Sequence, residues 1–367
     1  MAAVNLFLVY LAFNSTIIEK SPGYEPKLNA AKIMKNGLNV LKQHQEYRNI
    51  PIFKSIDPNS TGLIPKEESP IRSGNGRLAY KQAVLKPNFA ALMVDLFLSA
   101  GLESGDTIAV CLTGSMPGAN LALYSAAKSM NIHPVVITSV AASTWGATDP
   151  DFTWLDMEKI LFENDVIMQK SIAASMGGRG DCLRKTADVG GNLGRKLIKN
   201  SIAKNGIPLI RYVLEKDSSN LTRSIEKRLE IFSEVKPIIE YDGFINIGGG
   251  VASVGVGGIQ KLRKNGFLSN ETIQMMQLNP GVLSEFSTNG VPVIHVLRIS
   301  NLIKGILPPA GEQLKIGEGI LFFRERYNLL VAGIAAFLSL GMVIAVGWYS
   351  KHQINVQLKS YEVESII

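Results

Sequence analysis

The pattern of apolar and polar residues divides the chain into a long mixed region between two apolar ends. The second end is the clearer one: residues 329–349 carry no charge and only one polar side chain in their interior, Ser339. Arginines precede this stretch, and Trp348, Tyr349 and Lys351 close it. A helix needs about 20 apolar residues to cross a membrane, and aromatic residues gather at the interface. We therefore expect a transmembrane helix over 329–349, with a buried helix of a soluble domain as the alternative, and a short peripheral tail over 350–367.

The first apolar end is shorter. Residues 2–13 are apolar except for Asn5, residues 14–16 interrupt the pattern, and Ile17-Ile18 resume it. A signal peptide is the alternative, but no basic residues precede the stretch and no Ala-x-Ala cleavage site follows it. We expect a membrane anchor over residues 1–18, and hence two spans with both termini on one side.

Basic residues near the two ends bear on orientation. The domain side of the expected spans carries Lys20, Lys27, Lys32, Lys35, Lys315, Arg324 and Arg326, whereas the far side carries Lys351 and Lys359. Because lysine and arginine are enriched in cytoplasmic loops, this distribution favours a domain on the cytoplasmic face of a bacterial inner membrane. An exported domain behind an N-terminal anchor is the alternative.

Between the ends, strand-like and helix-like segments alternate. Short apolar runs predict strands over 107–112, 134–140, 171–175, 208–213, 243–247 and 291–297, and 3.6-residue periodicity predicts helices over 26–45, 88–100, 121–130, 154–163, 193–205, 221–235 and 268–278. This alternation predicts an α/β fold with a mostly parallel open sheet over residues 88–320. Residues 104–145 predict a Rossmann-like or sugar-isomerase-like βαβ unit. Residues 19–87 hold an amphipathic helix and a loop expected to wrap the domain.

Periodicity also predicts which side chains face the core. In the helix over 26–45, Leu28, Ala31, Met34, Leu38 and Leu41 share one face, and Lys27, Lys32, Lys35 and Lys42 are expected on the polar face. In the helix over 221–235, Ile225, Leu229, Phe232 and Val235 are expected to point inward.

Composition narrows the function classes. The 367 residues are 46% hydrophobic with a net charge of +7, and the mean hydropathy of +0.14 favours membrane segments. A basic chain can bind nucleic acid, an anionic membrane surface or an acidic polymer. No nucleic-acid motif is present, so we expect no nucleic-acid partner. Cys111 and Cys182 are too few and too far apart for a metal site or a disulfide framework.

A loop rich in small residues follows the first predicted strand. It contains Gly114, Ser115, Gly118 and Asn120, and it precedes a helix N-terminus, where free backbone N–H groups and the helix dipole favour an anion. The loop resembles the phosphosugar-binding loop of sugar isomerase domains, in which Ser139 at the end of the next strand belongs to the same site. The alternative is a plain turn between a strand and a helix.

An acidic and aromatic stretch follows the second predicted strand and contains Ser143, Trp145, Asp149 and Asp151. Asp149 and Asp151 are candidates for metal ligation or for acid–base work, because open α/β sheets bind ligands outside the carboxyl ends of their strands. Alternatively, Thr153 or Asp151 caps the following helix. We identify no cofactor and no metal site.

Two further glycine-rich loops follow predicted strands. The first holds Gly177, Gly178 and Arg179, and the second follows Asn246 with Gly248, Gly249 and Gly250. An arginine can clamp an anion, and consecutive glycines let a ligand approach the backbone; a close crossing of two backbones is the alternative. We expect these loops to form one pocket. His295 is interpreted as a core histidine more readily than as a catalytic base.

Most of the region 26–297 resembles the poly-gamma-glutamate system protein family, which accompanies the membrane machinery that makes and exports poly-γ-glutamate. The resemblance is carried by PNFAALMVDLF, GDTIAVCLTGSMPGANLA, TSVAASTWGATDPDFTWLDMEK, SIAASMGGRGD, SIEKRLEIF and FINIGGGVASVG. The segment STWGATDPDFTWLDME is the most specific of these, and the short N-terminal apolar segment departs from the family pattern.

The resemblance implies an accessory role in synthesis or export of a capsule-type polymer, with other subunits of that machinery as partners. It supplies no reaction and no catalytic residue. With the loops above, it leads us to expect an anionic ligand, either the polymer or a phosphorylated small molecule. The alternative is a phosphosugar-binding or hydrolytic enzyme that uses Asp149, Asp151 or His295.

Overall fold

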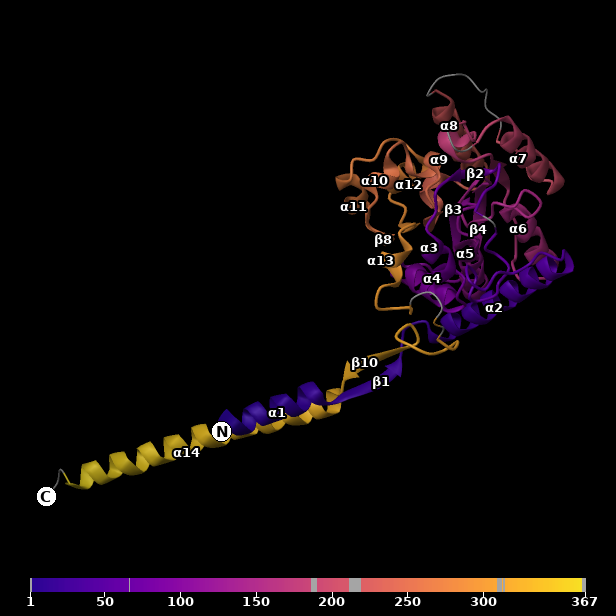
Figure 1. Ribbon diagram of the computed structural model, residues 1–367. Coiled ribbons are helices and arrows are strands. Elements are labelled where there is room, and N and C mark those ends of the chain that lie inside the picture. Colours follow the sequence, from indigo (N-terminus) through magenta and orange to yellow (C-terminus); the bar gives the residue numbers. More distant parts are fainter. Residues whose placement is uncertain are drawn as a thin grey trace. The chain divides into compact units, whose positions relative to one another are not determined.

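The computed structural model describes residues 2–65, 67–185, 190–210, 219–308, 312 and 314–364. Two compact units make up the chain (Figure 1). Met1–Ser21 and Phe323–Ile367 form the terminal unit, and Pro22–Phe322 forms the second, here called the α/β domain. The two ends of the chain therefore fold together, although they are far apart in sequence.

A six-stranded sheet lies at the centre of the α/β domain. Its strands follow the order β6 (Ala173–Ser175), β4 (His133–Ser139), β3 (Thr107–Thr113), β7 (Gly243–Ile247), β9 (Val293–Val296) and β8 (Gly266–Leu268). All neighbours are parallel except β8, which pairs antiparallel with β9. The predicted α/β fold with a mostly parallel sheet is confirmed. The short β8 was not predicted. Of the strand expected over 208–213, residues 211–213 lie outside the described residues, and Leu209 forms an isolated parallel bridge with Ala174.

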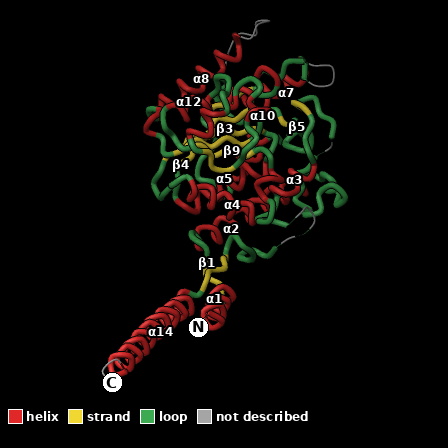
Figure 2. The backbone as a smooth tube through the Cα atoms, turned by 90° about the vertical axis from the view of Figure 1, so that its left-hand side faces the viewer, coloured by secondary structure: helices red, strands yellow, loops and turns green. Residues whose placement is uncertain are grey.

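Helices cover both faces of this sheet (Figure 2). On one face α2 (Tyr24–Tyr47), α4 (Asn88–Ser99) and α5 (Pro117–Met130) pack against one another. On the other face α8 (Ser219–Val235) and α12 (Val282–Thr288) contribute Phe232 and Phe286 to a core that also contains Cys111 of β3. Side chains of a strand alternate between its two faces. A strand buried on both faces is therefore apolar throughout, which explains the continuous apolar runs in the sequence.

Two side chains lie elsewhere than the periodicity indicated. Lys27 was expected on the polar face of α2, but its side chain is buried and forms an ion pair of 2.7 Å with Asp95 of α4. Val235 was expected to point inward from α8, but it is 52% exposed because it is the last residue of the helix. Helix ends leave the packed face, so periodicity is least informative there.

Shorter elements complete the α/β domain. They are β2 (Arg72–Gly74), α3 (Leu78–Val84), β5 (Ala142–Ser143), α6 (Trp154–Glu163), η1 (Arg179–Asp181), α7 (Asn192–Lys204), η2 (Ile238–Glu240), α9 (Val251–Val254), α10 (Gly258–Lys261), α11 (Asn270–Met275) and α13 (Ile299–Ile303). β2 and β5 pair in parallel as a separate two-stranded sheet. The part of residues 19–87 that was expected to be a wrapping loop thus contains the short strand β2 and the helix α3.

The terminal unit contains two helices and one β-ladder. α14 (Leu329–Glu364) includes a stretch, Leu329–Lys359, that is long and apolar enough to cross a membrane by length and composition, and its most apolar 18-residue window has a mean hydropathy of 2.6. The shorter apolar helix α1 (Ala2–Asn14) packs against it, and Ser339 donates a hydrogen bond of 2.8 Å to Asn5 Oδ1. β1 (Thr16–Lys20) pairs antiparallel with β10 (Phe323–Tyr327). Glu19 forms ion pairs with Arg324 and Arg326 across this ladder.

Candidate functional site

A cavity of about 390 Å³ opens at the carboxyl ends of β3, β4 and β7, and we call it the sheet-edge cavity. The chain runs outward from β3 to β4 and β6 and then continues on the other side of β3 with β7 and β9. Open α/β sheets bind ligands where the strand order reverses in this way. The cavity is lined by Ser73, Gly74, Asn75, Thr113, Ser115, Met116, Ser139, Ala141, Ser143, Gly178, Arg179, Gly249, Gly250, Val251, Ile259 and Leu297.

The cavity brings together residues from all four loops singled out in the sequence. Ser115, Ser139, Ser143, Gly178, Arg179, Gly249 and Gly250 line it. The remaining candidates, Gly114, Gly118, Asn120, Trp145, Asp149, Asp151, Gly177, Asn246 and Gly248, do not. Segments separated by more than a hundred residues thus meet at one edge of the sheet.

Several candidate glycines serve close packing of the backbone. A Cβ atom at Gly118 would lie 2.4 Å from the carbonyl oxygen of Val84, because the start of α5 passes directly over the end of α3. At Gly114 a Cβ would lie 2.3 Å from the carbonyl oxygen of Val140. Asn120 lies inside α5, where its Nδ2 donates to the carbonyl of Thr113 at 3.0 Å. These residues hold the end of β3 against its neighbours and so shape the cavity wall.

Three carboxylates of the acidic stretch, those of Asp149, Asp156 and Glu158, have structural partners. Asp149 pairs with Arg48 at 3.1 Å, and Asp151 is exposed. Thr153 and Asp156 form a capping box at the start of α6, so the capping alternative is confirmed at Thr153. Glu158 is buried and accepts hydrogen bonds from Tyr124 and Ser171. Burial raises the pKa of Glu158 above its usual range.

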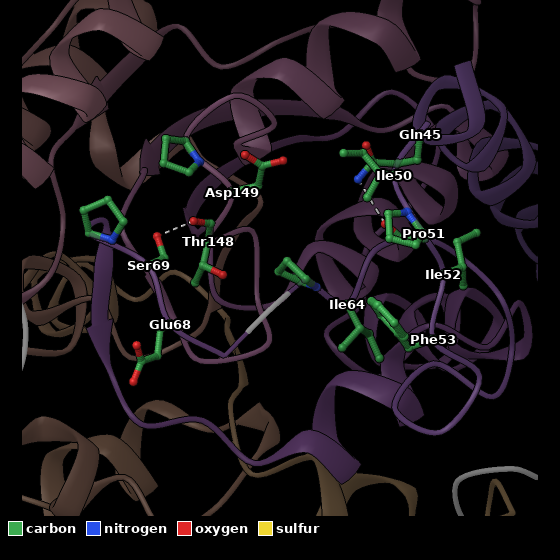
Figure 3. A pocket seen from close by; sticks show the side chains of 14 residues that line it. Gln45, Ile50, Pro51, Ile52, Phe53, Ile64, Glu68, Ser69, Thr148 and Asp149 are labelled. Carbon is green, nitrogen blue, oxygen red and sulfur yellow. Dashed lines mark hydrogen bonds between the residues drawn. The ribbon is translucent and has the colours of Figure 1, made fainter. Parts of the chain in front are cut away.

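Asp149 lines a separate cavity of about 310 Å³ beside the end of α2 (Figure 3). Ile50, Pro51, Ile52, Phe53 and Ile64 make its wall largely apolar, and Glu68 adds a second carboxylate. The Ser69 hydroxyl donates to the carbonyl of Thr148 at its rim, 2.5 Å away. Two acidic side chains and an apolar wall do not favour an anionic ligand.

The lining of the sheet-edge cavity has the opposite character. Of the lining residues that the structure describes, Arg179 is the only charged one, and the polar groups are serine and threonine hydroxyls, the Asn75 amide and the backbone of four glycines. Arg179 is exposed at the start of η1, so its guanidinium can turn toward a bound group. Gly178 before it has φ = 70°, a left-handed conformation that favours glycine. A cation among neutral donors is the arrangement expected for an anion.

A buried ion pair lies behind Ser139. Arg228 of α8 and Asp181 of η1 are 2.8 Å apart, and the two side chains are 2% and 1% exposed. Arg228 also donates to Ser175 at 2.6 Å and to Ser139 at 3.3 Å, and Ser224 donates to Asp181 at 2.6 Å. Buried charges need such partners, and this network fixes the loop that carries Arg179.

His295 of β9 lies on the strand next to Asn246. Its Nδ1 is 2.9 Å from Asn246 Nδ2, which also donates to the carbonyl of Gly248 at 2.7 Å. His295 is fully buried, and burial, with a smaller effect of Arg298, lowers the pKa of its imidazole to about 4. The imidazole is therefore neutral at physiological pH, and Asn246 and His295 support the glycine loop from below.

Sequence reasoning missed two buried cations near the cavity. Lys81 was not singled out because α3 was not predicted. Arg228 was not singled out either, although it occupies the same helical face as Leu221, Ile225 and Phe232. A charged residue at an apolar position of an amphipathic pattern is a signal that could have identified it.

Within the part of the chain that the structure describes, no group of three His, Cys, Asp or Glu side chains could hold a metal ion. Both cysteines are buried and unpaired in a disulfide. Comparisons of the chain with family models, with curated proteins and with solved structures gave no match.

Proposed function

We propose that this protein is a membrane-anchored accessory component of a bacterial poly-γ-glutamate synthesis or export system, and that its sheet-edge cavity binds an anionic ligand. The ligand is the γ-glutamyl polymer or a phosphorylated small molecule. The assignment to this system rests on the resemblance of the sequence segments described above. The anionic ligand rests on one observation: among the described residues that line the sheet-edge cavity, Arg179 is the only charged one.

The position of the cavity supports a binding role. It lies at the reversal of strand order, next to the βαβ unit that β3, α5 and β4 form. Asp149, Asp151 and His295 give little support to the enzyme alternative. Asp149 is paired with Arg48, Asp151 is exposed outside the cavity, and the imidazole of His295 is buried.

The anchoring part of the proposal rests on the terminal unit. The apolar stretch of α14 is almost entirely exposed, with 6% of its most apolar window buried, as expected for a helix surrounded by lipid. α1 is too short to cross by itself, but it packs against α14 and shares the Asn5–Ser339 hydrogen bond with it. We propose that both helices enter the bacterial inner membrane and that the α/β domain lies on the cytoplasmic side.

Calorimetry on the full-length protein in detergent tests the ligand. The titrants are a γ-linked glutamate pentamer, an α-linked pentamer of equal charge, and glucose 6-phosphate. We expect saturable binding of the γ-linked pentamer or of the sugar phosphate, weakening as salt rises. Arg179→Gln removes the cation and should raise Kd about tenfold or more, because a hydrogen bond to a charged group contributes about 1.5–3 kcal/mol.

Arg263→Gln is the matched control, since Arg263 is exposed, lies outside the sheet-edge cavity and carries the same charge. Its Kd should equal that of the unmodified protein. An equal rise of Kd in the two variants would show that the ligand responds to the net charge of the protein and not to the position of Arg179. Absence of binding by every titrant would overturn the anionic ligand, and failure to co-purify with the polymer synthase from the same membrane would overturn the accessory role.

A further inference from the structure

A lysine and a serine meet at the wall of the sheet-edge cavity. The Lys81 Nζ lies 2.8 Å from Ser143 Oγ and also donates to the carbonyl of Ser115. Ser143 lines the cavity and is half-buried, whereas Lys81 is 3% exposed and does not line it. Ser143 therefore separates the amine from the cavity, which is the order in which a nucleophile and its base are arranged.

The surroundings of Lys81 favour an uncharged amine. No carboxylate of the described residues forms an ion pair with it, and burial lowers the pKa of its ammonium to about 7. The backbone at Gly76 passes so close that a Cβ there would lie 3.1 Å from Ser143 Oγ and 3.2 Å from Lys81 Cε. A neutral amine keeps two N–H bonds, one for the Ser115 carbonyl, and gains a lone pair that accepts the proton of the Ser143 hydroxyl.

We propose that Ser143 is a nucleophile activated by Lys81, and that it forms an acyl-enzyme with an ester or amide that bears a carboxylate. Nucleophile and base need to lie within about 2.6–3.2 Å of one another, and serine–lysine pairs are a known variant of the serine–histidine arrangement. The backbone N–H of Ser143 donates to Ser115 Oγ at 3.0 Å, which fixes the position of the nucleophile.

The reaction consists of two balanced steps. Ser143 Oγ forms a bond to the carbonyl carbon while its proton passes to Lys81 Nζ, and the bond to the leaving amine or alcohol breaks as Lys81 returns that proton to it. Water then attacks the ester of Ser143, gives a proton to Lys81 and releases the carboxylic acid, while Lys81 protonates the serine oxygen. An amine in place of water gives transfer of the acyl group instead of hydrolysis.

The carboxylate of the substrate is the part of this inference that rests on the function proposed above. Arg179 lines the same cavity as Ser143, so it can pair with a carboxylate while the acyl carbon lies at the serine. The acylation of Ser143 itself does not depend on that pairing. The two statements can therefore fail separately.

The test uses the full-length protein in detergent with two activated esters, the anionic mono-p-nitrophenyl glutarate and the neutral p-nitrophenyl butyrate. Nitrophenolate release gives the rate, and intact mass followed by peptide mapping locates the adduct. We expect acylation at Ser143, faster with the glutarate ester by tenfold or more. Ser143→Ala should lose the adduct, and Lys81→Met should slow its formation by at least a hundredfold, as expected for loss of a general base.

The pH profile is a readout that a merely structural lysine would not give. Acylation should rise as pH increases through about 7, because only the neutral amine accepts a proton. Burial is the cause of the Lys81 shift. The charged and titratable groups on neighbouring elements are Arg77 at the N-cap of α3, Tyr80 within α3, and Tyr124 and Lys128 of α5, which bond to Glu158 and to the Asp165 carbonyl; α13 carries none. Arg72 lies on β2, which pairs with the strand of Ser143.

Lys86→Met is the matched control for Lys81→Met. Lys86 is equally buried, lies one residue beyond the C-cap of α3, and donates to the carbonyl of Pro308 at 2.6 Å, away from the cavity lining. Ser129→Ala is the control for Ser143→Ala, because Ser129 bonds the Pro26 carbonyl outside the cavity. Both controls should acylate at the unmodified rate.

The outcomes separate the two claims. Equal acylation of Ser143 by both esters supports the serine–lysine pair and overturns the carboxylate preference. Binding of the γ-linked pentamer without any adduct on Ser143 of the unmodified protein supports the binding role and overturns the nucleophile. The nucleophile is also overturned if the adduct maps to surface lysines. It is likewise overturned if Lys81→Met lowers thermal stability but leaves the acylation rate and its pH profile unchanged.

Discussion

The Arg228 guanidinium and the Asp181 carboxylate are 2.8 Å apart and almost completely buried, in contact with serines of which one, Ser139, lines the sheet-edge cavity. The pair connects α8 to the loop that carries Arg179. Removing both charges from water is costly, so the pair as a whole contributes little to the stability of the fold. Removal of one partner, however, leaves an uncompensated buried charge. The pair thus makes the geometry of one cavity wall depend on a single helix.

Breaking this pair should be strongly destabilising. Arg228→Met leaves Asp181 buried without its cation, and we expect the free energy of unfolding to fall by about 3–5 kcal/mol. Chemical denaturation of the detergent-solubilised protein, followed by circular dichroism, gives the value. Arg223→Met on the same helix is the control, because its partners Glu226 and Glu230 are exposed and its loss should barely move the midpoint. Equal midpoint shifts for the two variants would contradict the role of burial.

Two candidate glycines should respond differently to a methyl group. Gly118→Ala places Cβ 2.4 Å from a backbone oxygen, which cannot yield without moving α3 against α5, so the thermal midpoint should fall by several degrees. Gly250→Ala places Cβ 3.3 Å from the Thr113 Cγ2, a side-chain atom that needs to shift by only a few tenths of an ångström, and the φ of −57° at Gly250 suits alanine. That variant should keep its midpoint and lose affinity for the ligand, since Gly250 lines the cavity. Differential scanning fluorimetry and calorimetry together check both results, and equal midpoints would contradict the close packing.

His295 should make stability depend on pH. Burial, mainly, lowers the pKa of its imidazole from the usual 6.5 to about 4, so between these values the unfolded chain binds a proton that the folded chain does not. The stabilisation is complete above pH 6.5 and declines as pH falls toward 4, by about 3 kcal/mol in total. Urea midpoints at pH 7 and pH 4.5 measure it. His295→Gln should flatten this dependence, whereas His133→Gln, at an exposed residue, should preserve it.

Membrane topology can be checked with introduced cysteines, because both native cysteines are buried and give little background labelling. Glu103→Cys reports on the α/β domain and Lys359→Cys on the end of α14, and both positions are exposed. We expect a membrane-impermeant maleimide to label Lys359→Cys in intact cells and to label Glu103→Cys only after lysis. The reverse pattern would place the α/β domain on the outer side, and release of the protein by alkaline carbonate would contradict anchoring altogether.

Much of the α/β domain could be predicted from local pattern. Strands such as β3 and β4 are buried on both faces, so their apolar runs and the intervening Ala-rich α5 are visible without tertiary information. Capping chemistry is equally local, and Thr153 and Asp156 lie within one turn. By contrast, the antiparallel edge strand β8 has only three residues and its pairing is set by contact with β9, which no local signal encodes.

Only part of the candidate site could be predicted from the sequence, for a related reason. The sequence indicates that loops at the carboxyl ends of parallel strands converge, and Ser115, Gly178 and Gly250 do meet in one cavity. It does not reveal which polar side chains are buried behind that cavity. Lys81 and Arg228 acquire their character from desolvation and from partners distant in sequence, and both conditions exist only after the chain has folded.

The ladder of β1 and β10 has a mechanical consequence. Thr16 pairs with Tyr327 at the end where the chain continues into the two apolar helices, and Lys20 pairs with Phe323 at the end where it continues into Pro22–Phe322. A force that separates the two helices therefore breaks the residue pairs of the ladder one after another. The segment Pro22–Phe322 bears no tension until the last pair has opened. Single-molecule stretching from the two termini should show a small early extension from this ladder, followed by a separate, larger event when the α/β domain unfolds.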